Sequence, residues 1–334
     1  MLKRLVFCLS ICATSSTAES ALVDASLDQH ILPKVAAFSE SAATLAETSI
    51  THCSEKSPEL RAAFGRAFDD WIAISHLRFG PIETDERGFA IAFWPDTKGF
   101  TPKALNRLIA ERDPSIYDPE AFATVSVAAR GFYGLEFLLF DPGFAQQDTS
   151  EFRCDLIRAI STEISRNARG IAMDWQLYHG ALREPSDRGQ YKSDEEALRE
   201  VFKALLTGLQ FTADARLGRP LGTFERPRPR RADARRSQRS LRHIAISLEA
   251  TYELAMLLSE TEPEIRHSLV LAFDRALELA NDLEDPSFAN IADPASRFRV
   301  KVLQDAVNRI RDIATLELAP ALGVSAGFNA LDGD

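Results

Sequence analysis

Apolar residues recur at helical spacing along most of this chain. Between Pro119 and Phe140 the spacing predicts a single helix. Winding that helix at about 100° per residue puts apolar side chains on one face, namely Phe122, Val125, Ala129, Phe132, Leu139 and Phe140. The best match to a strand, from Ala90 to Trp94, is short and ends at Pro95. The pattern therefore predicts an all-α protein.

Residues typical of helix ends divide the rest of the pattern. Ser57-Pro58-Glu59 predicts a helix start, and Gly80-Pro81 predicts its end. The stretch from there to Phe100 is irregular and contains a tryptophan and several charges, so we expect a binding loop there. Thr101-Pro102 then predicts a short helix. The other predicted helices cover about 27–53, 151–182, 194–217, 237–259, 262–283 and 295–318.

A polar segment divides these helices into two sets. Residues 184–189 include both Pro185 and Gly189, which break helices. We therefore expect residues 19–186 to form one helical bundle and residues 187–334 a second one packed against it. A cleft between two bundles is where ligand sites tend to form.

Residues 1–18 have the pattern of a secretory signal peptide. Lys3 and Arg4 precede an apolar run, and Ser16-Thr17-Ala18 fits a signal peptidase site. The apolar run is too short to span a bilayer. The interpretation is a periplasmic protein with no transmembrane segment after cleavage of the signal.

The charge of the chain limits its partners. The formal net charge is −10, and it falls to −12 without Lys3 and Arg4. An acidic surface excludes nucleic acid and anionic membrane as main partners. A small ligand, an ion or a protein of the cell envelope is the expected partner.

The cysteines predict a disulfide. Loss of the signal peptide removes Cys8 and Cys12 and leaves Cys53 and Cys154. Two cysteines in an oxidising compartment most simply form one bond. They share no zinc-site spacing with each other or with the scattered histidines.

Glu136 is a carboxylate in the middle of the apolar face described above, and Tyr133 lies one turn before it. A buried carboxylate is costly unless something pairs with it. The partner is either an arginine in a structural ion pair or a hydroxyl network, a metal ion or a ligand. Arg78, Arg130 and Arg242 are the arginines that we expect near it.

Several segments resemble the imelysin-like family, some of whose members are classed as M75 metallopeptidases. Gly131-Phe132-Tyr133-Gly134-Leu135-Glu136 is similar to the family's Gly-x-His-x-x-Glu motif, with Tyr133 in place of His. Arg78-Phe79-Gly80-Pro81 and Phe93-Trp94-Pro95-Asp96 resemble its Gly-Pro and Trp-Pro-Asp segments. Arg226-Pro227-Arg228-Pro229 and Ser240-Leu241-Arg242 resemble a second-half segment of its proteobacterial branch. The resemblance covers about Leu27 to Leu318.

The resemblance implies a site in the cleft. Its expected ligand-binding residues are Arg78, Trp94, Asp96, Arg130, Tyr133, Glu136, Ser240, Arg242 and His243. If the protein holds iron or another metal ion, Glu136 and Tyr133 are the expected ligands, and in an enzyme Glu136 would be catalytic. Tyrosine in place of histidine weakens the expectation of a metal, because a neutral phenol is a poor zinc ligand and only a phenolate suits ferric iron.

Arginine is concentrated in residues 216–242. This segment holds ten arginines and three prolines, and the acids in or beside it are Asp214, Glu225 and Asp233. It is either a solvated connector, a wall for an anionic ligand or a docking surface for an acidic partner.

Three functions remain open. The first is a periplasmic imelysin-like protein that binds a ligand or ion in the cleft, without catalysis, and has the link to iron acquisition that the resemblance implies. The second is an M75-type metallopeptidase. The third is a helical module for protein interaction in the cell envelope.

Overall fold

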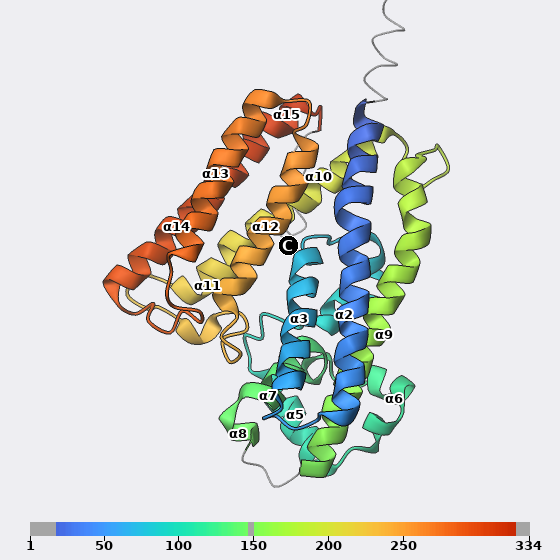
Figure 1. Ribbon diagram of the computed structural model, residues 1–334, viewed down its shortest axis with the longest axis vertical. Helices are drawn as coiled ribbons and strands as arrows, with labels where there is room; N and C mark the ends of the chain where they lie inside the picture. Colours follow the sequence, from blue (N-terminus) through green and yellow to red (C-terminus); the bar gives the residue numbers. More distant parts are fainter. Residues whose placement is uncertain (1–17, 146–149, 325–334) are drawn as a thin grey trace, which may run out of the picture.

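The computed structural model describes residues 18–145 and 150–324 (Figure 1). Within these ranges the regular structure is helical, and the nearest approach to a strand is an isolated bridge between Thr223 and Arg226. The prediction of an all-α fold is confirmed. The proposed signal peptide lies outside the described residues except for Ala18, which begins a helical stretch over 18–26.

The first group of helices is built on three long ones. Helices α2 (Leu32–Thr51), α3 (Pro58–Ile74) and α9 (Ser150–Arg183) carry most of its core, and α2 packs against both of the others. The shorter elements are η1 (Leu27–Ile31), η2 (Gly80–Ile82), η3 (Thr84–Glu86), α4 (Arg87–Ile91), α5 (Phe100–Glu111), η4 (Pro114–Tyr117), α6 (Pro119–Ala123), η5 (Val127–Ala129), α7 (Gly131–Phe140) and α8 (Pro142–Ala145).

The second group lies beside the first (Figure 1). Its helices α12, α13 and α14 pack in succession, and α10 contacts both α12 and α14. The bounds are α10 (Asp194–Gln210), η6 (Phe211–Leu217), α11 (Gly218–Leu221), η7 (Pro229–Arg231), α12 (Ser240–Leu258), α13 (Pro263–Asn281), α14 (Pro294–Ile313), η8 (Ala314–Leu318) and α15 (Ala319–Ala321).

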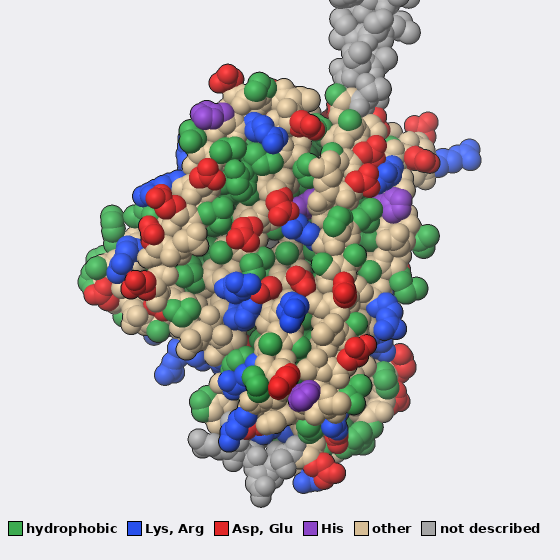
Figure 2. All heavy atoms as spheres, viewed as in Figure 1, with side chains coloured by type: hydrophobic (Ala, Val, Ile, Leu, Met, Phe, Trp, Pro, Cys, Tyr) green, Lys and Arg blue, Asp and Glu red, His purple; other side chains and the backbone are tan. Residues whose placement is uncertain are grey.

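The two groups meet chiefly where α12 packs on α3. Asp69 on α3 pairs with Arg239 and, at 2.7 Å, with Arg242. On the face in Figure 2, acidic and basic side chains are intermixed along this junction. The junction is thus closed by ion pairs as well as by packing. The exact division at residues 186 and 187 stays a prediction.

Two predicted helix starts are confirmed by their caps. The Ser57 hydroxyl accepts a hydrogen bond from the Leu60 amide at 3.1 Å, and Ser193 caps α10 in the same way. The short helix α5 begins at Phe100, and its cap comes from Asp96, whose carboxylate accepts from the amides of Phe100 and Thr101. Helix α3 ends at Ile74, six residues before the predicted stop at Gly80.

The prediction of one helix over Pro119–Phe140 is wrong. The chain forms α6, then η5, and begins α7 anew at Gly131. Gly131 has φ +65°, and a Cβ there would lie 2.3 Å from the carbonyl oxygen of Ile91. The backbone of α4 therefore occupies the space that a side chain at position 131 would need, and only glycine allows this turn.

The predicted disulfide is confirmed. Cys53 and Cys154 are bonded, with their Cα atoms 5.0 Å apart and a sequence separation of 101. The bond joins the segment after α2 to the first turn of α9. Within 18–145 and 150–324, no helix combines the length and hydrophobicity that a membrane crossing requires.

Candidate functional site

The two groups of helices are joined at the site by a hydrogen bond between buried side chains. The Tyr133 hydroxyl on α7 donates to the carboxylate of Asp233, which lies 100 residues later in the arginine-rich segment. Both side chains are buried, at 7% and 1% exposure. The motif tyrosine is therefore held by the second group of helices rather than by its own.

Asp233 is the centre of a larger cluster. Its second carboxylate oxygen pairs with Arg216 and accepts a hydrogen bond from His243 Nδ1 at 3.0 Å. Its backbone oxygen accepts from the Ser240 hydroxyl. Arg216 also reaches back across the junction to the Ser75 hydroxyl at 3.3 Å. Asp233 thus accepts from four protein groups, which are Tyr133, Arg216, His243 and Ser240.

The cluster fixes the protonation of its members. Burial opposes the charge on Asp233, but His243, Arg216 and Tyr133 outweigh burial and bring the pKa of this carboxyl down to about 2. Burial lowers the pKa of His243. Burial together with the Asp233 charge raises the pKa of Tyr133 well above its usual range. At neutral pH the tyrosine is a neutral donor, the histidine is neutral and the aspartate is charged.

Glu136 has a different partner in the same segment. Its Oε1 accepts from the Ser237 amide at 2.9 Å and from the Ser237 hydroxyl at 2.8 Å. Burial raises the pKa of Glu136, and the bonds from Ser237 and the charge of Arg236 only partly oppose this. Tyr133 and Glu136 thus bind Asp233 and Ser237 respectively, and the charge that acts on the Glu136 carboxyl comes from Arg236 rather than from Arg78, Arg130 or Arg242.

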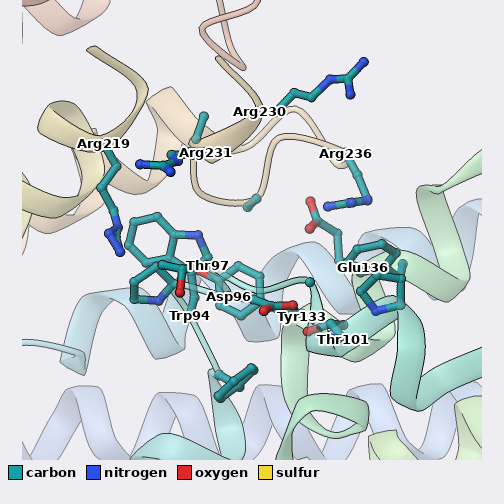
Figure 3. A pocket seen from close by; sticks show the side chains of 17 residues that line it. Trp94, Asp96, Thr97, Thr101, Tyr133, Glu136, Arg219, Arg230, Arg231 and Arg236 are labelled. Atoms are coloured by element: carbon teal, nitrogen blue, oxygen red, sulfur yellow. Dashed lines mark hydrogen bonds between the residues drawn. The ribbon is translucent and has the colours of Figure 1, made fainter. Parts of the chain in front are cut away.

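A pocket of about 210 Å³ opens beside these residues (Figure 3). The first group supplies the segment from Phe93 to Pro102 together with Tyr133, Glu136 and Phe137. The second group supplies Arg219, Arg230, Arg231, Ala232, Ala234 and Arg236. In Figure 3, Arg219 and Arg231 lie near the Trp94 ring, Arg236 lies near Glu136, and Arg230 extends away from the others.

A second pocket, of about 290 Å³, shares Trp94, Pro95 and Tyr133 with the first. It also contains Arg78, whose guanidinium lies over the Phe211 ring, 4.3 Å from the centroid. Arg216 lines it too. The loop around Trp94, which the sequence predicted as a binding loop, thus forms part of the wall of both pockets.

The other predicted site residues have structural partners. Arg130 lies away from both pockets and pairs with Glu163 at 2.8 Å. Arg242 is exposed and pairs with Asp69. Asp96 lines the first pocket, but both of its oxygens accept backbone hydrogen bonds. Ser240 and His243 belong to the cluster around Asp233.

The residues that could hold a metal ion do not fit one. The Tyr133 hydroxyl is a neutral donor to Asp233, and Glu136 Oε1 already accepts two hydrogen bonds. In the described parts of the chain, no three or more His, Cys, Asp or Glu side chains form a group that could bind a metal. A tyrosine with a raised pKa is also a poor source of phenolate.

Three residues that bind Tyr133, Glu136 or Asp233 were not predicted from the sequence. Asp233 and Arg216 appeared only as members of the arginine-rich segment, and Ser237 had no assigned role. A usable signal existed for Asp233, since it is an acid between Arg231 and Arg235. Its pairing with Tyr133 could not be read from the sequence, because 100 residues separate them.

Comparison with known proteins decides the family. The model of the family described as Peptidase_M75: Imelysin matches residues 31–314. The chain belongs to the imelysin family. A comparison with curated proteins gave no match.

Two solved structures are similar to this imelysin-family chain. An imelysin-like protein from Psychrobacter arcticum 273-4 is 20% identical, with a TM-score of 0.77 over 94% of this chain and 98% of its own. A "putative iron-regulated protein A precursor" from Parabacteroides distasonis ATCC 8503 is 13% identical, with a TM-score of 0.75 over 90% of this chain and 94% of its own. At these identities the likeness shows a shared fold, in which the motif helix of this imelysin-family member is α7.

Proposed function

We propose that this imelysin-family protein binds a ligand in the pocket between its two groups of helices, in the periplasm and without catalysis. The observation that carries the proposal is the composition of that pocket. Its walls come from both groups, and they include the motif residues Tyr133 and Glu136 and the loop residue Trp94. A concave site with an aromatic wall and a few polar groups is typical of small-molecule binding.

Binding is favoured over peptide cleavage by the state of the motif. Tyr133 is a neutral donor held by Asp233, and Glu136 is held by Ser237. Both groups therefore serve to join the two groups of helices at the pocket wall. A metallopeptidase would need a metal-bound water, and within the described residues no group of three or more His, Cys, Asp or Glu side chains could hold a metal ion.

A link to iron acquisition is part of the proposal. It is supported by the family membership and by the description of the Parabacteroides distasonis protein as iron-regulated. The level of this protein should rise when the source cells are starved of iron. An unchanged level would contradict the link and leave the binding proposal intact.

Recovery of the bound molecule tests the binding proposal. The protein is purified gently from the periplasm, and its mass is measured under native conditions and after denaturation. A Thr97→Trp variant places a large side chain at the exposed rim of the pocket, while Thr44→Trp on α2 makes the same change on a remote exposed surface. We expect an added mass in the wild type and in Thr44→Trp that is lost in Thr97→Trp.

Two results would count against binding in this pocket. One is an added mass that Thr97→Trp retains, because the ligand would then occupy another place. The other is the absence of any added mass, combined with no stabilisation of the wild type by an extract of periplasmic small molecules. Cell fractionation checks the location.

A further inference from the structure

We infer that the ligand of this pocket is a small organic polyanion, whose oxyanion groups bind Arg219 and Arg231 and whose flat or apolar body lies on Trp94. This inference rests on the proposed function and names the chemical class of its ligand. The charge balance of the pocket wall, the position of Trp94 and the volume of the pocket support it.

Arg219 and Arg231 carry charges that no acid neutralises. Among residues 18–145 and 150–324, neither guanidinium has a carboxylate within ion-pair distance, and neither donates a hydrogen bond to another side chain. Of the other two arginines that line the pocket, Arg236 is paired with Asp141 at 2.8 Å, and Arg230 extends away from the others in Figure 3. This wall is therefore locally positive, although the chain as a whole has a net charge of −10.

The acids of the pocket are bound to other groups. Asp96 accepts from the amides of Phe100 and Thr101 at 2.9 and 2.8 Å. Glu136 accepts hydrogen bonds from the amide and the hydroxyl of Ser237 at 2.9 and 2.8 Å. The positive charge of Arg219 and Arg231 is therefore not cancelled within the pocket.

The two arginines also act on each other. Partial burial, and after it the charge of Arg231, lowers the pKa of Arg219. A ligand that places one anionic group against each guanidinium would offset that repulsion, and each group would accept paired N–H donors, which is the geometry that arginine offers to carboxylate and phosphate. Because each arginine would bind one anionic group, the ligand carries two or more such groups.

Trp94 supplies a surface for the rest of the ligand. The Arg219 guanidinium lies over the Trp94 ring, 5.8 Å from its centroid, so a group bound by Arg219 lies beside that ring. Figure 3 shows Arg219 and Arg231 around this ring. The volume of about 210 Å³ is below the ~300 Å³ at which sites for drug-sized molecules begin. The ligand is therefore small.

Calorimetric titration with defined probes tests the inference. The probes are benzene-1,2,4-tricarboxylate, citrate, inorganic phosphate and the uncharged benzamide, each added to the full mature protein. We expect the aromatic tricarboxylate to bind most tightly, citrate less tightly, phosphate weakly and benzamide not at all. Raising the salt from about 20 to about 300 mM should weaken binding, because the charges at the pocket mouth are screened.

Charge-removing variants assign the binding to the two arginines. Arg219→Gln and Arg231→Gln should each lower the affinity for the tricarboxylate by about tenfold or more, as expected for loss of a charge-assisted pair. Arg309→Gln is the matched control, because Arg309 is exposed on α14 and lies outside the pocket. It should bind as the wild type does. Circular dichroism of each variant confirms that it is folded.

The possible failures are distinct. Equal binding by wild type, Arg219→Gln and Arg231→Gln, or equal weakening by Arg309→Gln, would overturn the inference. Phosphate binding as tightly as the tricarboxylate would overturn the assignment of the organic body. If no anion binds but Thr97→Trp still removes a co-purified neutral molecule, the polyanion inference fails while the proposed function stands. If no molecule co-purifies and none binds, the proposed function fails with it.

Discussion

Tyr133 donates its hydroxyl hydrogen to Asp233, and this bond connects the motif helix of the first group to the arginine-rich segment of the second. The same aspartate also pairs with Arg216 and His243. Tyrosine therefore stands at the motif's histidine position as a buried structural donor. Its role is to hold together the two walls of the pocket.

Replacing Tyr133 with phenylalanine should destabilise the protein by about 1–3 kcal/mol, because a buried carboxylate loses one of its donors. The free energy of unfolding from urea titration measures the change. Tyr117→Phe is the control, since the Tyr117 hydroxyl also bonds an aspartate, Asp155, but is exposed. We expect no measurable change there. Equal stability of Tyr133→Phe and wild type would show that the bond to Asp233 contributes nothing.

Lowering the pH should decrease the stability of the protein because of a pair of buried histidines. His30 Nε2 and His76 Nε2 are 3.0 Å apart, and His30 Nδ1 bonds Glu253 on α12 at 3.3 Å. Lys34 pairs with the same Glu253 at 2.7 Å. Burial lowers the pKa of His30 and, more strongly, that of His76, and the nearby Lys34 adds to both shifts.

The sign of this effect follows from proton binding. Below the ordinary histidine pKa of about 6.5, the unfolded chain takes up protons at these positions and the folded one does not. Stability should therefore fall as the pH is lowered from about 6.5. Urea titrations across this range should show a weaker fall for His76→Gln, whose amide replaces the Nε2 donor. His267→Gln, which replaces an exposed residue on α13, should show the same dependence of stability on pH as the wild type. An identical slope in all three proteins would rule out the histidine pair as the cause.

Gly131→Ala should prevent normal folding or destabilise the protein severely. The residue has φ +65°, and the added Cβ would lie 2.3 and 2.4 Å from the carbonyl oxygens of Ile91 and Ala90. Those oxygens belong to the backbone and cannot move aside without displacing α4. Thermal melting and the yield of soluble protein measure the effect.

Gly180 is the matched control for this substitution. It lies inside α9, and a Cβ there would meet no atom within 4 Å. Gly180→Ala should stabilise the protein by about 0.4–1 kcal/mol, because alanine restricts the unfolded chain and favours the helix. A loss of stability in Gly180→Ala comparable to that in Gly131→Ala would contradict the steric explanation.

Reduction of the bond between Cys53 and Cys154 should lower the stability. For a closed loop of about 100 residues, chain-entropy estimates give up to roughly 4–5 kcal/mol. The mature protein, denatured without reductant, should contain no titratable thiol. In a Cys53→Ser, Cys154→Ser double variant, reductant should have no further effect. Two reactive thiols in the unreduced wild type would disprove the bond in the native protein.

Local sequence determined the helices of this protein, because their signals act over a few residues. The 3.6-residue repeat predicted the all-α class, Ser57 caps a helix where Ser57-Pro58-Glu59 predicted a start, and Ser193 caps the helix predicted from residue 194. The disulfide followed from the count of cysteines that remain once the predicted signal peptide is removed. The four motif segments pointed to the family, which the comparison confirmed.

Tertiary structure alone decided the breaks and the partners. The spacing from Pro119 to Phe140 suits a helix, but the backbone of α4 packs so closely at Gly131 that the chain turns there. The sequence pattern predicted that the Glu136 carboxylate is buried and needs a partner, but it did not identify that partner. That partner, Ser237, lies 101 residues away, and Asp233 lies 100 residues from Tyr133. A pattern within one helix carries no information on contacts at such separations, since they depend on how the two groups of helices pack.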